Sequence, residues 1–208
     1  MIIRVLFTAL SLIVGAAPAA EEVEGPVPGW TEVIFDGRTD YRPEDECVRA
    51  VSSNAASGLV RRQEVDLTEK PELVWRWRAE QPLRGADADE QSKAGDDFLA
   101  RVYVVHETFL PWRSRAVNYV WARAVPKGEH WKNPFAGQAV MVAVQSGYEG
   151  LGQWHAFRRD VRADFRRIHD RDIDTVHAVA IMTDTDNTGG RAKACYELPR
   201  FRSRAEGE

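Results

Sequence analysis

The segment LVWRWRAE, residues 73–80, indicates the fold class of this 208-residue chain. Apolar side chains occupy alternate positions from Leu73 to Ala79, and most positions between them carry a charged side chain. Successive side chains of a β-strand point to opposite faces, so this alternation predicts a strand with one face on a core and the other in solvent. Trp75 and Trp77 would share the core face.

The segment FLARVYVVH, residues 98–106, is apolar on both faces apart from Arg101, which predicts a central strand covered on both sides. Clear strand patterns recur at residues 117–124, 139–146 and 175–182, and weaker ones at 30–37, 59–67 and 154–160. Turn residues separate these segments. Helical segments are too few to supply the crossovers of a parallel sheet. We therefore expect an all-β fold, an antiparallel two-layer jelly-roll sandwich with one short helix.

The short helix is predicted directly after Asp160. The Asp160 side chain can accept hydrogen bonds from the N–H groups of the first turn. Val161, Phe165 and Ile168 then fall on one helical face, which would cover part of the core.

The first 19 residues are predicted to be a secretion signal. Arg4 precedes an apolar run at residues 5–16, and residues 17–19, Ala-Pro-Ala, fit a small-x-small cleavage site. The run is shorter than the ~20 residues of a membrane-spanning helix, and an uncleaved anchor is the alternative. We therefore expect a periplasmic or secreted bacterial protein with no membrane span after signal removal.

The remaining chain of about 190 residues suits one domain with a sizeable core. We expect a flexible segment at residues 20–28, a single β-sandwich domain at 29–202 and a disordered tail at 203–208, and we expect a monomer. The formal net charge is −4, and it becomes −5 when Arg4 leaves with the signal. This acidic balance argues against a nucleic-acid partner and shows no polybasic run for an anionic membrane.

Cys47 and Cys195, the two cysteines of the chain, lie in strand-like segments near its opposite ends. Export would place them in an oxidising compartment, where a disulfide can form. A bridge would close a loop of roughly 150 residues, worth about 4–5 kcal/mol in the loop-entropy model. It would require the flanking strands to be neighbours. Two separate buried thiols are the alternative.

The segment IMTDTDNTGG, residues 181–190, resembles the start of a calcium loop. Asp184, Asp186, Thr188 and Gly189 occupy the first, third, fifth and sixth positions, but Cys195 stands where the bidentate Glu of an EF-hand belongs. An EF-hand is therefore excluded. Three interpretations remain: a looser calcium site using Asp184 and Asp186, the edge of a ligand site, or a hairpin whose aspartates accept backbone hydrogen bonds. Calcium is the one cofactor that the sequence suggests.

Arg101 follows Asp96 and Asp97 and interrupts the central strand. A guanidinium group on a strand covered on both faces needs a carboxylate partner or a wet cleft. The pattern indicates either a buried Arg–Asp pair, with Asp184 or Asp160 as partner, or a ligand groove crossed by the strand.

Tyr119 and Trp121 share one face of the segment NYVWA, and Asn118 lies on the other. An exposed Tyr–Trp platform would stack against sugar rings, because aromatic faces offer flat apolar area with a polar rim. Burial in the core is the alternative, since large aromatic side chains are mostly buried.

Signals for catalysis are weak. The chain has no G-x-S-x-G motif, and its five histidines show no metal-ligand spacing. Two aspartates such as Asp96 and Asp184 could carry out acid–base chemistry on a glycosidic bond, which keeps a glycan-cleaving hydrolase or lyase as an alternative function.

Several motifs together resemble a bacterial family, domain of unknown function 3047. They are GW…F (Gly29, Trp30, Phe35), ASGLVRR, PELVWRWR, GDDFLARVYVV, NYVWA, the W…RDVRADF run from Trp154, and VAIMTDTDNTG. The resemblance covers residues 30–201 and implies a small exported protein, with no implied activity. The matching polar and aromatic positions are Asp96, Asp97, Arg101, Asn118, Tyr119, Trp121, Asp160, Asp164, Asp184, Asp186, Asn187 and Thr188. The cysteines stand outside this pattern, and the strand pattern is also similar to galactose-binding-type jelly rolls.

These observations predict a non-catalytic module that binds a carbohydrate or another polar small molecule in the cell envelope. Segments 96–105, 117–123 and 181–188 would form the groove, with Tyr119 and Trp121 stacking on the ligand. The predicted ligand-binding residues are Asp97, Arg101, Asn118, Tyr119, Trp121, Asp184 and Asp186. A periplasmic structural or assembly partner is a third possibility.

Overall fold

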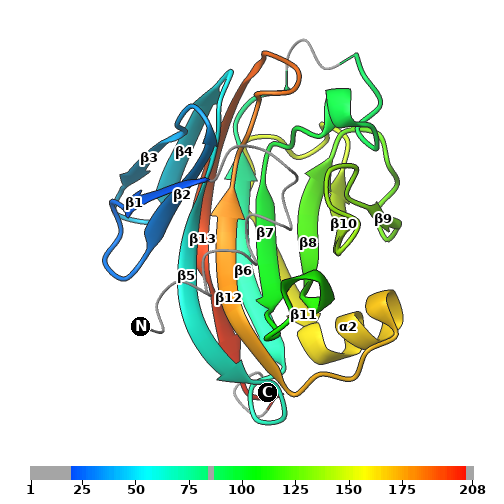
Figure 1. Ribbon diagram of the computed structural model, residues 1–208. Helices are drawn as coiled ribbons and strands as arrows, with labels where there is room; N and C mark the ends of the chain where they lie inside the picture. Colours follow the sequence, from blue (N-terminus) through cyan, green and yellow to red (C-terminus); the bar gives the residue numbers. More distant parts are fainter. Residues whose placement is uncertain (1–19, 84–86, 205–208) are drawn as a thin grey trace.

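The computed structural model describes residues 20–83 and 87–204, so the predicted signal at residues 1–19 lies outside the described chain. In these described ranges, an eight-stranded sheet and a five-stranded sheet stack face to face, with one α-helix at one end (Figure 1). This arrangement confirms the predicted two-layer jelly-roll sandwich. No helix of the described residues is long and apolar enough to cross a membrane.

The larger sheet contains, in spatial order, β1 (Glu21–Glu24), β2 (Thr31–Asp36), β5 (Ala56–Asp66), β12 (Thr175–Met182), β7 (Arg101–His106), β8 (Arg115–Ala122), β10 (Ala139–Ser146) and β9 (His130–Lys132). The smaller sheet contains β11 (His155–Asp160), β6 (Glu72–Ala79), β13 (Arg191–Arg202), β4 (Val48–Ser53) and β3 (Asp40–Pro43). The helix is α2 (Val161–His169), and two 3-10 turns are η1 (Lys93–Gly95) and η2 (Pro111–Arg113).

One strand pair departs from the expected antiparallel pattern. β10 runs parallel to β8, and its Ala139 lies opposite Ala116. The chain between these strands forms β9, which pairs antiparallel with the far side of β10. This excursion returns the chain to the end of the sheet where β8 began, so a parallel pair forms without a crossover helix.

The two ends of the domain are more ordered than expected. The segment 20–28, predicted to be flexible, contains β1, whose Glu21 lies opposite Ile34 of β2. A backbone hydrogen bond of 3.0 Å from Gly25 N to Trp30 O closes the turn between these strands. At the other end, Arg204 donates to Asp160 Oδ2 at 2.6 Å. The rest of the predicted tail, residues 205–208, lies outside the described residues.

Aromatic side chains from both sheets fill the space between the layers. Trp75 and Trp77 of β6 point inward, as their alternation predicted. Trp75 stacks on Tyr119 with ring centroids 5.2 Å apart, and Trp77 stacks on Trp121 at 6.4 Å. Tyr119 and Trp121 are fully buried. The predicted exposed sugar-stacking platform is therefore wrong, because β8 turns these rings toward β6 and away from solvent.

The disulfide between Cys47 and Cys195 is confirmed, with Cα atoms 5.7 Å apart. It joins residues 148 positions apart in the sequence. Cys47 directly precedes β4, and β4 pairs antiparallel with β13, which contains Cys195. The two strands that the disulfide requires to be adjacent are therefore neighbours in the smaller sheet.

The helix α2 begins where the sequence predicted. Asp160 Oδ1 accepts a hydrogen bond of 2.8 Å from Ala163 N, which satisfies one free N–H of the first turn. Val161 and Phe165 are buried, and Ile168 packs against the same core. A contact of 2.9 Å between His169 Nε2 and Ala116 O fixes the end of the helix to β8.

Candidate ligand-binding site

Alternate residues of β7 and β8 point away from the smaller sheet, toward what we call the outer face of the larger sheet. Val102 and Val104 belong to the inner core, so Arg101 and Tyr103 lie on the outer face. β7 runs between β12 and β8, and Arg101 lies opposite Met182 on one side and Val120 on the other. The turn after β12 and the segment before β7 therefore meet at the same end of the sheet.

Arg101 is the centre of the polar contacts on the outer face. Its side chain is buried, with a total exposed fraction of 2%. Nε donates to Asp184 Oδ1 at 2.8 Å and Nη2 donates to Asp184 Oδ2, so the pair is bidentate. Nη1 donates to Tyr103 Oη at 3.1 Å. Burial alone would lower the pKa of Arg101, but Asp184 together with Tyr103, Asp96 and Asp97 outweighs it and raises the pKa well above its usual value. The predicted buried Arg–Asp pair thus forms with Asp184.

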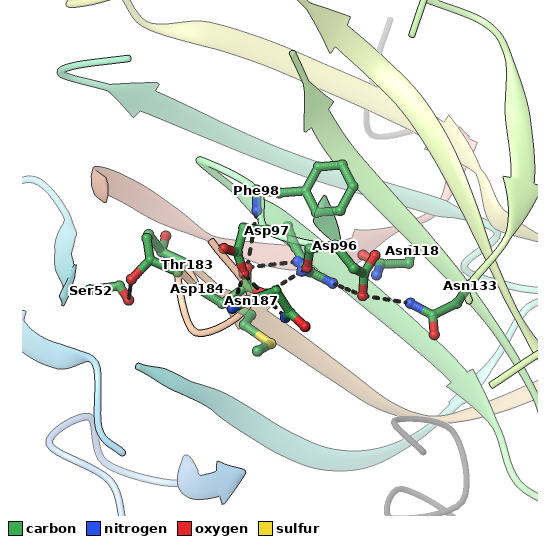
Figure 2. Close-up of polar contacts among 12 residues, drawn as sticks. Ser52, Asp96, Asp97, Phe98, Asn118, Asn133, Thr183, Asp184 and Asn187 are labelled. Carbon is green, nitrogen blue, oxygen red and sulfur yellow. Dashed lines mark hydrogen bonds and ion pairs between the residues drawn. The ribbon is translucent and has the colours of Figure 1, made fainter. Parts of the chain in front are cut away.

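Asp97 holds the loop between β12 and β13. Its Oδ1 accepts hydrogen bonds from Asn187 N at 3.2 Å and Asn187 Nδ2 at 3.3 Å. Its Oδ2 accepts from Thr188 N at 2.6 Å and Thr188 Oγ1 at 2.5 Å. Figure 2 shows Asp97, Asp184 and Asn187 close together. Both oxygens of this buried carboxylate are therefore occupied by donors of the protein itself.

The calcium hypothesis rests on the carboxylates of Asp97, Asp184 and Asp186, each of which offers an oxygen within 4.8 Å of the others. Asp97 and Asp184 already accept hydrogen bonds on both oxygens, and Asp184 also faces a guanidinium charge. A cation would have to displace these donors. Asp186 differs, because it is half-buried and its Oδ1 accepts no hydrogen bond from the described residues. Burial, followed by the Asp97 charge, raises the pKa of Asp186 to about 6.

Asp96, Asn118 and Asn133 form the other end of the polar contacts (Figure 2). Asp96 Oδ2 accepts a hydrogen bond of 3.0 Å from Asn133 Nδ2, and it lies 3.5 Å from Arg101 Nη1. Asn118 and Asn133 both direct Nδ2 at Met141 Sδ, at 3.2 and 3.7 Å. We call Asp97, Asp184, Arg101, Asp96, Asn118 and Asn133 the polar row.

Two acceptor oxygens of the polar row have no hydrogen-bond donor among the described residues. Asp96 Oδ1 and Asn118 Oδ1 are buried and accept no hydrogen bond from any residue in the described ranges. Asp96 is 4% exposed and Asn118 is 0% exposed. Burial raises the pKa of Asp96, against the lowering effects of Arg101 and Asn133. The polar row therefore offers acceptor capacity that the protein does not use internally.

A family model supplies the first comparison with known proteins. The model described as "Protein of unknown function (DUF3047)" matches residues 28–198. The chain belongs to this family. The resemblance carried by its motifs is thereby confirmed. Among curated proteins, none matches the DUF3047 chain.

Solved structures share the architecture of the DUF3047 chain at low sequence identity. The endoglucanase Cel12A from Rhodothermus marinus is 8% identical, with a TM-score of 0.51, over 89% of this chain and 97% of its own. A thermostable cellulase derived from the Rhodothermus marinus enzyme is 9% identical, with a TM-score of 0.52, over 89% and 97%. A family 11 carbohydrate-binding module from Clostridium thermocellum is 12% identical, with a TM-score of 0.44, over 90% and 96%. For the endoglucanase and the thermostable cellulase, whose TM-scores exceed 0.5, the likeness shows a common fold.

The DUF3047 fold gathers some of the predicted ligand residues and disperses others. Asp97, Arg101, Asn118 and Asp184 all belong to the polar row, with Asp186 beside it. Tyr119 and Trp121 point to the opposite side of the same sheet. Asn133 was not predicted. Its Oδ1 accepts from Phe135 N at 2.9 Å and from Ala136 N at 3.0 Å, so the Asn-Pro turn at residues 133–134 was the signal that could have placed it.

Proposed function

We propose that this DUF3047 protein binds a carbohydrate, or another hydroxyl-rich polar ligand, at the polar row. Asp96 and Asn118 are the direct ligand contacts in this proposal. The observation that carries it is the pair of buried acceptor oxygens, Asp96 Oδ1 and Asn118 Oδ1, which receive no hydrogen bond from the described chain. Leaving one buried acceptor without a donor costs about 1–3 kcal/mol. A ligand that donates to both oxygens recovers that free energy on binding.

The neighbouring groups favour a neutral ligand with both donors and acceptors. The carboxyl group of Asp96, which holds one open acceptor, lies next to two donor groups, Asn133 Nδ2 and the Arg101 guanidinium. A sugar presents adjacent hydroxyl groups that donate and accept at once. Arg101 already neutralises much of the aspartate charge, so a cationic ligand gains less from this site. Because the fold is shared with a cellulase and an endoglucanase, β-glucans are the first ligands to test.

For Asp97 and Asp184 we propose a role in the binding site without a chemical step. A general acid or base needs a carboxyl group free to exchange its proton with substrate. Asp97 and Asp184 are engaged on both oxygens by donors of the protein. We also propose that the protein works in the periplasm or outside the cell, which the Cys47–Cys195 disulfide supports.

Titration calorimetry against a panel of soluble glycans, beginning with cello-oligosaccharides, tests the proposal. Asp96→Asn and Asn118→Ala should each weaken binding of a positive glycan by about tenfold or more, since each removes an acceptor for a ligand hydroxyl. Asp164→Asn is the matched control. It also alters a buried aspartate, but Asp164 contacts Tyr119 and Arg159 on the inner side, so affinity should stay within about twofold while stability falls.

Two results would overturn the proposal. One is a panel in which no glycan binds the folded wild-type protein. The other is a glycan whose affinity is the same in wild type, Asp96→Asn and Asn118→Ala, because the contact would then lie elsewhere on the molecule.

A further inference from the structure

The loop between β7 and β8 exposes two large apolar side chains. Phe109 is 86% exposed and Trp112 is 61% exposed, which makes them the most exposed large hydrophobic residues of the described chain. Isolated exposed apolar residues are common on protein surfaces, but two bulky aromatics on one short loop are not explained by packing.

The loop presents these side chains in a fixed conformation. Thr108 N donates to Ser114 Oγ at 3.0 Å, and Thr108 Oγ1 donates to Leu110 O at 2.7 Å. Within the 3-10 turn η2, Arg113 N donates to Leu110 O at 2.8 Å. These hydrogen bonds close the loop on itself, and Phe109 and Trp112 extend from it into solvent.

Three arginines lie in or near the loop that exposes these aromatics. Arg113 belongs to the same loop, and Arg115 Nη1 donates to Trp112 O at 3.1 Å. Arg171 follows α2, whose last residue His169 contacts Ala116 O in the strand that starts with Arg115. Figure 1 shows the green loop between β7 and β8 beside α2. Arg171 and Arg113 both lie close enough to Arg115 for their charges to act on it.

The positive charges of this patch are not neutralised by the fold. None of Arg113, Arg115 and Arg171 forms an ion pair with a carboxylate within the described residues, whereas most arginines of β6, α2 and β11 do. Burial lowers the pKa of Arg115, and the like charges of Arg171 and Arg113 lower it further. The three guanidinium groups therefore act as one cationic patch on a protein whose net charge is −4.

We propose that Phe109, Trp112 and the three arginines dock the protein on an anionic phospholipid membrane. Aromatic side chains favour the interface between lipid headgroups and acyl chains, where their apolar rings leave water. Basic side chains near an anionic surface each contribute about 1 kcal/mol, roughly a fivefold gain in affinity. The loop combines both features at one edge of the sandwich.

Other classes of partner would use either the aromatic side chains or the arginines, but not both. A neutral glycan stacks on aromatic rings but gains nothing from three unpaired guanidinium groups. A soluble polyanion attracts the arginines but has no apolar layer for Phe109 and Trp112 to enter. The surface is also separate from the polar row, so its role is independent of the proposed ligand binding.

Vesicle co-sedimentation tests the docking surface. The protein is prepared from Ala20 onward, because the apolar run at residues 5–16 would itself bind lipid. Binding is measured on vesicles that contain about one-third phosphatidylglycerol in phosphatidylcholine, and on phosphatidylcholine alone. We expect binding to the anionic vesicles that weakens at high salt, and at least tenfold weaker binding to the neutral ones.

Matched variants separate the loop from the rest of the surface. Phe109→Ser with Trp112→Ser should reduce vesicle binding by about tenfold or more, and Arg113→Gln by about fivefold. Tyr148→Ser and Arg191→Gln, which alter an exposed aromatic and an exposed arginine elsewhere, should leave it unchanged. All variants should melt within a few degrees of wild type, because the changed side chains are exposed.

Three outcomes contradict the proposal. The first is wild-type protein that stays in solution with anionic vesicles at low salt. The second is membrane binding that the loop variants retain in full. The third is equal competition by a soluble anionic polysaccharide whose binding does not depend on Phe109 and Trp112, which would identify the patch as a polyanion site.

Discussion

The two sides of the larger sheet each contain a buried arginine–aspartate network, and the two networks are built differently. On the inner side, Asp164 of α2 accepts hydrogen bonds from Tyr119 Oη at 2.8 Å and Arg159 Nε at 2.8 Å. On the outer side, Asp184 accepts a bidentate contact from Arg101, and Asp96 lies beside it. Both networks pair a buried aspartate with an arginine.

The networks differ in completeness and in access to solvent. No side-chain oxygen of Asp164 is left without a donor, and the side chain of its partner Arg159 is 32% exposed. In the outer network the side chains of Arg101 and Asp184 are each 3% exposed, and Asp96 Oδ1 has no donor within the described chain. Removing charges from water is costly, and an incomplete network does not recover that cost. The inner network is therefore complete in itself, whereas the outer one retains the open acceptor on which the proposed binding rests.

The largest effect is expected when one partner of the outer pair is removed. Asp184→Ala leaves the Arg101 charge buried without its main counter-ion, and we expect a loss of about 3–5 kcal/mol in the free energy of unfolding. Arg101→Met combined with Asp184→Leu replaces the whole pair by apolar side chains. The double variant should be close to wild type or more stable, because no buried charge is left unpaired.

Urea denaturation of both variants measures this effect, with glycan affinity as the second readout. If the stable double variant also binds the ligand as tightly as wild type, the pair contributes neither stability nor binding, and the contrast between the two networks disappears.

The sequence predicted the Arg101–Asp184 pair better than it predicted the positions of the aromatic residues Tyr119 and Trp121. Arg101 on a doubly covered strand needed a carboxylate partner or a wet cleft, and Asp184 was one of the two carboxylates named as its partner. The aromatic residues illustrate the limit of the same reasoning. Alternation in NYVWA showed that Tyr119 and Trp121 share a face, but which sheet that face meets depends on the long-range pairing of β8 with β7 and β10.

Asn133 and the arginine patch were beyond sequence reasoning for a related reason. Asn133 reaches Asp96 only because β9 and β10 pair at the edge of the sheet, after a loop with no strong pattern of its own. The composition of the chain is acidic, which suggested no basic surface. Arg171 joins Arg113 and Arg115 because α2 folds back onto β8, and local charge counting cannot anticipate such a contact.

A smaller effect is expected from the inner network. Tyr119→Phe removes the hydroxyl that donates to Asp164 and keeps the ring that stacks on Trp75. A hydrogen bond to a charged group contributes about 1.5–3 kcal/mol, so we expect a loss near the lower end, since Arg159 and Arg167 still hold Asp164. Thermal or urea unfolding measures it, and glycan affinity should not change. A loss of affinity equal to that of Asn118→Ala would show that the two sides of the sheet are coupled.

The smallest effect concerns pH and the half-buried Asp186, which lies at the edge of the outer network. Burial and the Asp97 charge raise the pKa of Asp186 from 3.8 to about 6. The folded state therefore holds this proton more tightly than the unfolded state. The stabilisation is complete below about pH 4 and is lost as the pH rises through about 6.

Because Asp186 is partly exposed, solvent screening limits this stabilisation to on the order of 1 kcal/mol. In Asp186→Asn the contribution is absent at every pH, so wild-type stability minus variant stability should fall by about that amount between pH 4 and pH 7. Taking this difference cancels the titration of the histidines and of Asp96. If this stability difference does not change with pH, Asp186 lies in solvent. Only the buried members of the outer network would then differ from the inner network.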